Sequence, residues 1–332
     1  MKLLITGGAG FIGANFVHHT VAAHPDYDVV VVDAFTYAGH RSSLLPVADG
    51  ITLVEADICD EAAMDEAMSG CDVVVHFAAE SHVDRSIDDQ DAFARTHVIG
   101  TGALLDAARE LGVARYLQVS TDEVYGSIDS GSFSEQSPLN PSSPYSATKA
   151  AGDLLVSAHV HTHGIQASIC RGSNNYGPRQ YPEKLIPLMI LNAIHGDHLP
   201  VYGDGLNVRN WLFVEDFARA IHTVLERGEP GEAYNAGGPD ELPNLDVVKR
   251  ILSATGRDES LVEYVTDRPG HDRRYSLASD KLRGLGWEPS VGFDEGLPLT
   301  VEWSRDNEWW WGPIRSGEYR EYYERHYGRA LG

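Results

Sequence analysis

Short apolar runs alternate with longer stretches of helical period through the first half of the chain. The apolar runs are Lys2–Thr6, Asp28–Asp33, Ile51–Glu55, Cys71–Ala79, Tyr116–Val119 and Gln166–Arg171. Apolar runs that alternate with helical segments are typical of strands buried on both faces of a parallel sheet. The pattern therefore predicts an α/β fold with a doubly wound parallel sheet.

The alternation stops after the last of these runs, at the glycine- and asparagine-rich stretch Gly172–Pro178. We predict one domain over residues 1–172 and a smaller lobe made mainly of residues 173–332. Ala233–Gly238 again has the composition of a strand. The chain is therefore expected to return to the first domain near residues 207–237, which makes the C-terminal lobe discontinuous.

One long helix is predicted from Ser86 to Leu111, with apolar positions on more than one face. A helix of this kind buries one face on the sheet, and the second face contacts either the chain itself or a partner subunit. The sequence leaves these two alternatives open.

A glycine-rich turn, Gly7-Gly8-Ala9-Gly10-Phe11-Ile12-Gly13, joins the first apolar run to a helical segment. Its glycines permit a tight turn and let backbone amides approach a pyrophosphate at the helix N-terminus. Asp33 follows about 20 residues later, where an acid accepts hydrogen bonds from ribose hydroxyls. A carboxylate there repels the 2′-phosphate of NADP, and only Arg41 could offset that repulsion. These residues predict a Rossmann-type site for NAD.

Polar side chains that suit acid–base chemistry follow the fifth apolar run. Tyr145 and Lys149 lie four residues apart in a predicted helix, so they share one helical face. A tyrosine has an ordinary pKa near ~10, and Lys149 is expected to favour the phenolate. Thr121, Asp122 and Glu123 add a hydroxyl and two carboxyls, which share a pocket only if the strand ends and the chain turns. The alternative is a structural aromatic residue with solvated charged neighbours.

Composition narrows the range of partners. The 332 residues carry 26 Lys and Arg against 49 Asp and Glu, a formal net charge of −23. Such a surface repels nucleic acids and anionic membranes, so neither is expected as a partner. Cys59, Cys71 and Cys170 have no zinc or C-x-x-C spacing, and no apolar run approaches the about 20 residues of a membrane span. We expect a cytoplasmic protein with no metal site.

A local positive cluster, Asp267–Tyr275, stands out from this acidic background because it contains Arg268, Arg273 and Arg274. With Arg209 and Lys184 it could neutralise the pyrophosphate of a nucleotide sugar, which suits bidentate guanidinium contacts. The alternative is a run of solvated surface charges.

The sequence resembles the extended short-chain dehydrogenase/reductase family over essentially its whole length. The resemblance rests on the glycine-rich turn, the Ser120-Thr121 pair and Tyr145-x-x-x-Lys149. Within that family the chain is similar to the dTDP-glucose 4,6-dehydratases in the blocks Ala78–Asp84, Ser120–Gly126, Asn174–Pro178, Glu183–Pro187 and Asp267–Asp272. Two departures from the family pattern lie outside the expected catalytic set: Phe217, where the family commonly has histidine, and the loop Ala38-Gly39-His40-Arg41, which differs from the usual A-G-N run.

The resemblance assigns roles to individual positions. Catalysis is expected from Thr121, Asp122, Glu123, Tyr145 and Lys149. The residues expected to bind NAD are Gly7, Gly10, Phe11, Ile12, Gly13, Asp33, Thr36, Asp57, Ile58, Ala79, Thr96, Tyr145, Lys149 and Asn175. The residues expected to bind the nucleotide sugar are Ser81, Thr121, Asn174, Lys184, Arg209, Asn244, Arg268 and His271. A homodimer through the long helices is also expected from the family.

These roles imply dehydration of dTDP-glucose to dTDP-4-keto-6-deoxyglucose with recycled NAD. Tyr145 would take the proton of the 4-hydroxyl while hydride leaves carbon 4. Glu123 would then remove the carbon 5 proton and Asp122 would protonate the departing 6-hydroxyl, before hydride returns to carbon 6. A nucleotide-sugar 4-epimerase, a nucleotide-sugar decarboxylase and a non-catalytic NAD-binding sensor are the alternatives. The Asp122-Glu123 pair distinguishes the dehydratase from the epimerase, which expels no water.

Overall fold

In the computed structural model, which describes residues 1–267 and 270–316, a parallel seven-stranded sheet forms the centre of the molecule. Its order is β10-β6-β5-β4-β1-β2-β3. The strands are β1 (Lys2–Thr6), β2 (Asp28–Asp33), β3 (Ile51–Glu55), β4 (Val73–His76), β5 (Arg115–Thr121), β6 (Ala167–Gly172) and β10 (Ala233–Ala236). The predicted α/β fold with a Rossmann-type doubly wound sheet is confirmed. The order of the strands reverses between β1 and β4, where folds of this kind bind ligands at the carboxyl ends.

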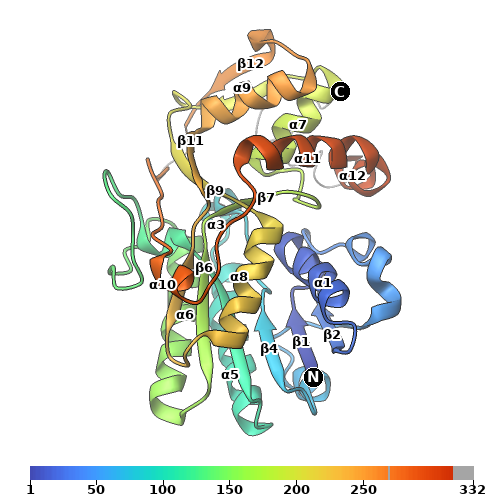
Figure 1. Ribbon diagram of the computed structural model, residues 1–332, viewed down its shortest axis with the longest axis vertical. Helices are drawn as coiled ribbons and strands as arrows, with labels where there is room; N and C mark the ends of the chain where they lie inside the picture. Colours follow the sequence, from blue (N-terminus) through green and yellow to red (C-terminus); the bar gives the residue numbers. More distant parts are fainter. Residues whose placement is uncertain (268–269, 317–332) are drawn as a thin grey trace.

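Helices cover both faces of the main sheet (Figure 1). One face packs against α1 (Phe11–Ala23) and α8 (Val214–Arg227), and the other against α2 (Glu61–Met68), α5 (Thr101–Glu110) and α6 (Pro144–His163). Successive strand residues point to opposite faces, so Leu3 and Ile5 join the first core while Leu4 joins the second. Burying each such side chain stabilises the fold by about 2 kcal/mol.

A second group of elements lies beyond the carboxyl ends of the main sheet, in the upper part of Figure 1. Its helices are α7 (Leu185–His195), α9 (Asn244–Thr255), α11 (Phe293–Asp306) and α12 (Glu308–Ser316). Its strands are β7 (Asn174–Tyr176), β9 (Val208–Phe213) and β11 (Asp240–Pro243) in one sheet, and β8 (Leu199–Tyr202) and β12 (Val262–Val265) in another. Ile190, Trp211, Val248 and Phe293 belong to the core of this group.

The chain crosses back to the main sheet twice. The first return is α8 and β10, and β10 extends the sheet beyond β6. The second is α10 (Asp280–Gly284) and the residues after it, where Leu282 and Trp287 enter the core beneath α8. The Trp287 indole donates to the Asp216 carbonyl at 3.0 Å. We therefore propose that the first domain includes α8, β10 and α10.

The prediction of one helix from Ser86 to Leu111 was wrong. The structure has α3 (Val83–Asp88), α4 (Asp91–Ala94), a π-helical turn (Arg95–Gly100) and α5 in its place. The break falls at Asp89, whose backbone is extended and whose carboxylate accepts the N–H of Asp91 at 3.0 Å. A local side-chain bond of this kind offers the backbone an alternative to helix.

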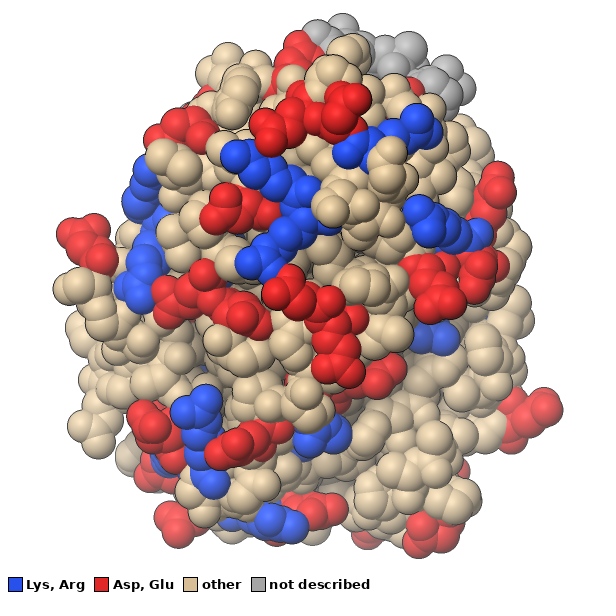
Figure 2. Space-filling view, turned by 45° about the horizontal axis from the view of Figure 1, so that its top comes forward, with Lys and Arg blue, Asp and Glu red and all other residues tan. Residues whose placement is uncertain are grey.

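Acidic and basic side chains are interspersed on the face shown in Figure 2. Arg273 pairs with Asp204, Arg274 with Glu241 and Arg250 with Asp294. Each of these three arginines therefore lies beside an acid. Among the described residues, none of the helices combines the length and apolarity that a bilayer crossing requires.

Candidate active site

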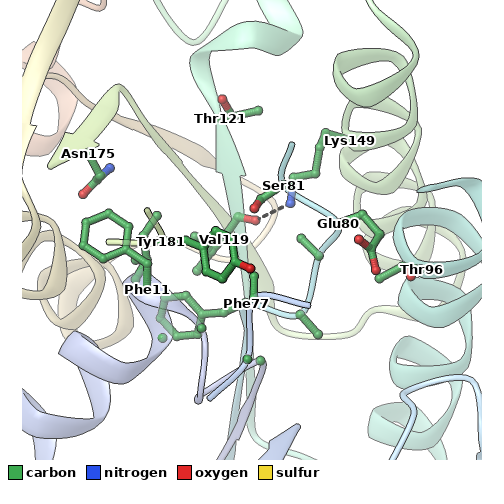
Figure 3. Close-up of a pocket in the computed structure, with 18 of the residues that line it drawn as sticks. Phe11, Phe77, Glu80, Ser81, Thr96, Val119, Thr121, Lys149, Asn175 and Tyr181 are labelled. Atoms are coloured by element: carbon green, nitrogen blue, oxygen red, sulfur yellow. Dashed lines mark hydrogen bonds between the residues drawn. The ribbon is translucent and has the colours of Figure 1, made fainter. Parts of the chain in front are cut away.

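A cavity of about 320 Å³ lies at the carboxyl ends of the central strands. It is the place where turns after β1, β2, β4, β5 and β6 meet, and Figure 3 shows part of its lining. All residues predicted to bind NAD line it: Gly7, Gly10, Phe11, Ile12, Gly13, Asp33, Thr36, Asp57, Ile58, Ala79, Thr96, Tyr145, Lys149 and Asn175. The predicted catalytic residues Thr121, Asp122 and Glu123 line it too. The fold thus collects residues from distant parts of the chain in one space.

The N-terminus of α1 contributes its first turn to the cavity wall. Gly13 packs directly on the preceding turn, because a Cβ at this position would lie 2.2 Å from the Gly7 carbonyl oxygen. This close packing brings the glycine-rich turn and the first helical amides to the cavity. Such amides, together with the helix dipole, stabilise an anion. These residues therefore fit the pyrophosphate of a dinucleotide.

Asp33 is buried at the end of β2 and also lines the cavity. Its carboxylate accepts the N–H groups of Ala9 and Phe35, both at 2.9 Å. Burial raises the pKa of Asp33, and these two hydrogen bonds oppose the rise. Arg41, the one residue expected to favour NADP, instead pairs with Glu55. The arrangement fits a ribose without a 2′-phosphate.

The chain turns immediately after β5, which brings Asp122 and Glu123 into the same cavity. A 3₁₀ turn, Asp122–Tyr125, begins there, and its N-cap Thr121 accepts the Glu123 N–H on its hydroxyl at 3.3 Å. Gly126 ends the turn with a φ of 81°, a conformation that favours glycine. Asp122 and Glu123 were expected to share a pocket only if the strand ended before them, and β5 does end at Thr121.

Asp122 is buried, with 2% of its surface exposed. Its Oδ1 accepts the Thr121 hydroxyl at 3.2 Å, and no described group hydrogen-bonds its Oδ2. Burial and then the neighbouring Glu123 raise the pKa of Asp122 to about 8, against an opposing effect of Arg209. Asp122 is therefore protonated at neutral pH and can act as a general acid.

Tyr145 lies in the first turn of α6, which is fixed by a capping box. The Ser143 hydroxyl accepts the Ser146 N–H at 3.2 Å, and the Ser146 hydroxyl accepts the Ser143 N–H at 3.0 Å. A cap of this kind stabilises a helix by about 1 kcal/mol. The Tyr145 N–H donates to the Ser86 hydroxyl at 3.2 Å, which ties this turn to α3. Tyr145 is thereby held beside Thr121, which hydrogen-bonds its phenol.

The expectation that Lys149 lowers the pKa of Tyr145 does not match the structure without ligands. Burial and then the negative charge of Glu123 raise the pKa of Tyr145 well above its ordinary value. The Lys149 ammonium donates to the Val119 carbonyl at 2.8 Å, as Figure 3 shows, and burial lowers its pKa to about 8. The shared helical face did not determine which group the Lys149 ammonium contacts, because the Val119 carbonyl near the end of β5 also lies within its reach.

The residues predicted to bind substrate fall into two groups. Ser81, Thr121, Asn174 and Lys184 line the cavity. The Lys184 ammonium donates to the Ser81 carbonyl at 2.5 Å, which joins the start of α7 to the loop after β4. This first group is in place to contact a sugar beside the catalytic residues.

Among the described residues, Arg209, Asn244 and His271 lie outside the cavity lining. Arg209 is buried on β9 and donates to the Asp272 carbonyl at 2.9 Å. His271 contacts Asp267 at 2.6 Å, and Asn244 begins α9. Arg268 lies outside the residues that the structure describes.

The expected positive cluster is smaller than the sequence suggests. Arg273 and Arg274 are paired with Asp204 and Glu241, so they do not add free positive charge. Those acids come from β11 and from the turn after β8. Arg209 is the member of the group whose charge acts on Asp122.

Sequence reasoning missed several residues that line the cavity, including Glu80, Tyr181 and Phe217. Glu80 stands within the Ala78–Asp84 block and Tyr181 two residues before the Glu183–Pro187 block, so their positions could have pointed to them. Phe217 was placed outside the catalytic set as a departure from the family pattern. It is fully buried in α8, and a Cβ at Gly172 would lie 2.6 Å from its ring, so β6 approaches it closely.

The cavity fits a dinucleotide and holds a tyrosine and a lysine from one helix, together with a buried acid beside a second carboxyl. These features define the class of short-chain dehydrogenase-like enzymes equipped to expel water. The family model of GDP-mannose 4,6 dehydratase matches residues 4–300, and the chain belongs to this family.

Relatives support this assignment. The chain is 49% identical over 323 residues to a dTDP-glucose 4,6-dehydratase of Streptomyces niveus, covering 95% of this chain and 96% of that protein. The crystal structure of DesIV, a dTDP-glucose 4,6-dehydratase from Streptomyces venezuelae with NAD and TYD bound, is 50% identical with a TM-score of 0.93, covering 95% and 100% of the two chains. A Thermus thermophilus UDP-glucose 4-epimerase in complex with NAD is 31% identical, with a TM-score of 0.87 and coverage of 92% and 100%.

Proposed function

We propose that the protein dehydrates dTDP-glucose to dTDP-4-keto-6-deoxyglucose and recycles one tightly bound NAD in each turnover. The observation that carries this proposal is the buried Asp122 beside Glu123 in the cavity that fits the dinucleotide, where burial raises the pKa of Asp122 to about 8. Epimerisation at carbon 4 needs no acid that expels water, so this pair favours the dehydratase over the epimerase. The glycine-rich turn and Asp33 would hold NAD, which when bound would supply a positively charged nicotinamide that can take up a hydride and give it back.

Tyr145 and Thr121 act on the 4-hydroxyl. Because they hydrogen-bond each other, both can contact one substrate oxygen. Tyr145 takes the proton of that hydroxyl, and Thr121 donates to the same oxygen. Burial, and then the negative charge of Glu123, raise the pKa of Tyr145 and oppose this proton transfer, so it requires positive charge nearby. Lys149 by itself does not lower that pKa in the structure without ligands, so the positive charge that NAD would bring when bound is needed beside it.

Glu123 and Asp122 then remove water across carbons 5 and 6. The ketone at carbon 4 acidifies carbon 5, and Glu123 takes that proton. Asp122, protonated below about pH 8, donates to the 6-hydroxyl, which leaves as water. The two adjacent residues hold different roles because Asp122 is the more deeply buried one.

The substrate extends from the cavity toward the second group of predicted residues. We propose that the sugar contacts Ser81, Asn174 and Lys184, and that the nucleotide diphosphate reaches Arg209. The buried guanidinium of Arg209 lies 4.3 Å from the centre of the Tyr275 ring, which fixes its plane. A fixed guanidinium suits an oxyanion.

Incubation of the purified protein with dTDP-glucose, and in parallel with UDP-glucose, tests the proposed function directly. Without added cofactor, we expect a 4-keto-6-deoxy sugar from dTDP-glucose, identified by mass loss of one water. A 4-epimer would contradict the dehydratase, and turnover of UDP-glucose in preference would contradict the proposed nucleotide.

The rate of turnover should fall on the alkaline side of about pH 8. Burial raises the pKa of Asp122 to about 8 and lowers that of Lys149 to about 8, so both groups lose a needed proton as the pH rises through this value. Deprotonation of Asp122 and deprotonation of Lys149 are therefore both expected to lower kcat. A profile of kcat between about pH 6 and 9.5 measures it, and constant kcat up to the highest pH would contradict the general-acid role.

We also propose a homodimer. Ile99 and Leu154 are 62% and 61% exposed, and they lie on the π-helical turn and on α6, which pack together. Large exposed apolar side chains on adjacent helices are typical of a subunit interface. Leu154→Glu should therefore shift the protein to monomers in size-exclusion chromatography with light scattering. Leu299→Glu on α11, where the leucine is 44% exposed, is the matched control and should leave the mass unchanged.

Free thiols support a cytoplasmic location, which we propose as well. Cys59, Cys71 and Cys170 form no disulfide, and Cys71 and Cys170 are buried. Unpaired buried thiols are typical of proteins from reducing compartments.

A further inference from the structure

Three segments far apart in the sequence meet beside the Asp33 end of the cavity. The first is the loop of residues 34–43, of which Ala34, Thr36, Ala38 and Gly39 line the cavity. The second segment is the one before α7 that contains Tyr181, which also lines the cavity. The third is α12 in the C-terminal part of the chain. Tyr181, Trp310 and Trp311 belong to one buried apolar cluster, against which Tyr37 and Ala38 pack.

A buried hydrogen bond joins α12 to the 34–43 loop. The indole nitrogen of Trp310 donates to the Ser43 hydroxyl at 3.1 Å, and the two residues are 3% and 2% exposed. The Trp310 ring also meets His40 edge-on, with 6.2 Å between ring centres. His40 in turn stacks on Tyr181 at 5.7 Å. Neither Ser43 nor Trp310 lines the cavity, so they act on it only through the loop and Tyr181.

The helix that carries Trp310 is held independently of the loop. The Trp311 indole donates to the Ser304 carbonyl at 2.7 Å. Arg315, at the other end of α12, donates to Asp197 at 2.7 Å and to Asn192 at 3.2 Å, which anchors the helix to α7 and its following turn. The α12 helix is therefore a fixed point against which the 34–43 loop is held.

The loop has other attachments as well: His18 donates to the Ser43 carbonyl at 2.8 Å, the Tyr37 and Ser81 hydroxyls lie 3.3 Å apart, and Arg41 pairs with Glu55. Its backbone joins the glycine-rich turn through the His40 N–H, which donates to the Ala9 carbonyl at 3.1 Å. Phe35 has a φ of 48°, which is uncommon for a residue with a side chain. A loop in such a conformation depends on its surroundings to stay in place.

We propose that Ser43 and Trp310, here called the latch, retain NAD in the cavity through the catalytic cycle. The loop that covers the Asp33 end must move for the dinucleotide to leave, and the latch slows that movement. This inference rests on the proposed function, in which one cofactor serves both redox steps. If the cofactor left between the two redox steps, the oxidised sugar could not be reduced again. Slow release of the cofactor therefore matters more here than in a dehydrogenase that exchanges its cofactor.

The dissociation rate of NAD tests the latch without any substrate. The holoenzyme is loaded with radiolabelled NAD and chased with excess unlabelled NAD. Trp310→Phe, which keeps a ring and removes the indole N–H, should release the label about 3- to 10-fold faster. Ser43→Ala should do the same, and the double variant should be no faster than either single variant because both remove one hydrogen bond.

Trp309 provides a matched control on the same helix. Its indole donates to the Asn307 side chain at 3.1 Å, the residue is 52% exposed, and it does not belong to the apolar cluster against which the loop packs. Trp309→Phe should leave the release rate unchanged. Release at the wild-type rate from both latch variants would overturn the inference, as would equal acceleration by Trp309→Phe or effects that multiply in the double variant.

Turnover without added NAD separates this inference from the proposed function. Latch variants should lose activity over successive turnovers and regain it when NAD is added, while the wild type stays linear. A wild-type protein that retains NAD but leaves dTDP-glucose unchanged would contradict the proposed function and leave the latch standing. Normal turnover with unchanged NAD release in the variants would contradict the latch alone.

Discussion

Tyr145→Phe is expected to slow oxidation at carbon 4 by about 10³-fold, because it removes the group that accepts the proton of the 4-hydroxyl. The phenol is buried beside Thr121 and under the influence of Glu123, so water cannot readily replace it. The effect should appear as a lower rate in a single turnover followed by stopped-flow absorbance. NAD should still copurify with the variant, because the glycine-rich turn and Asp33 are unchanged.

Tyr116→Phe is the matched control for this prediction. Tyr116 is also buried, and its hydroxyl donates to the Gln118 side chain at 3.1 Å, but it lies in the core beneath α5 rather than at the cavity. The control variant should oxidise substrate at the wild-type rate. A Tyr145→Phe variant that oxidises carbon 4 as fast as the control would refute the role of the phenol.

Asp122→Asn is expected to slow the loss of water by at least about 10²-fold, because an amide cannot donate the proton that the 6-hydroxyl needs. Asparagine resembles the protonated form that burial imposes on Asp122, so the fold should tolerate it. Oxidation at carbon 4 should persist, and exchange of the carbon 5 proton with solvent should continue. NMR in deuterated water measures the loss of water and the exchange of the carbon 5 proton on the same sample.

Glu123→Gln should give the complementary result. It removes the base at carbon 5, so exchange with solvent should fall by about 10²-fold or more and water loss with it. Each variant therefore serves as the control for the other. Rapid exchange in Glu123→Gln together with rapid dehydration in Asp122→Asn would show that the two carboxyls do not have these roles.

The residues that line the cavity were predictable because the main sheet is parallel. Each of its strands ends at the same edge, so Gly7, Asp33 and Thr121 had to meet once the apolar runs were identified. The spacing of four also placed Tyr145 and Lys149 on one face of α6 correctly. For these five residues the reasoning needed only local pattern and the rule for parallel strands, whereas other cavity residues, such as Thr96 and Asn175, were expected from the family resemblance.

Contacts between elements far apart in the sequence were not predictable in this way. Lys149 donates to the Val119 carbonyl because α6 packs close enough to β5 for its ammonium to reach that oxygen. The spacing of residues along the sequence does not reveal how closely two elements pack. The pKa of Tyr145 is raised first by its own burial and then by the charge of Glu123, and neither can be known before the elements are packed together. Arg273 and Arg274 looked available until the structure placed Asp204 and Glu241 beside them. The break at Asp89 follows from a side-chain bond that competes with helix.

The central claim is that a single hydride leaves carbon 4 and returns to carbon 6 of the same sugar. Conversion of a mixture of dTDP-glucose deuterated at carbon 4 and dTDP-glucose that carries carbon-13 but no deuterium tests it most directly. We predict that deuterium appears at carbon 6 of the product and stays in molecules without carbon-13, with no external reductant consumed. Deuterium lost to the medium, or found in the carbon-13 product, would contradict the account.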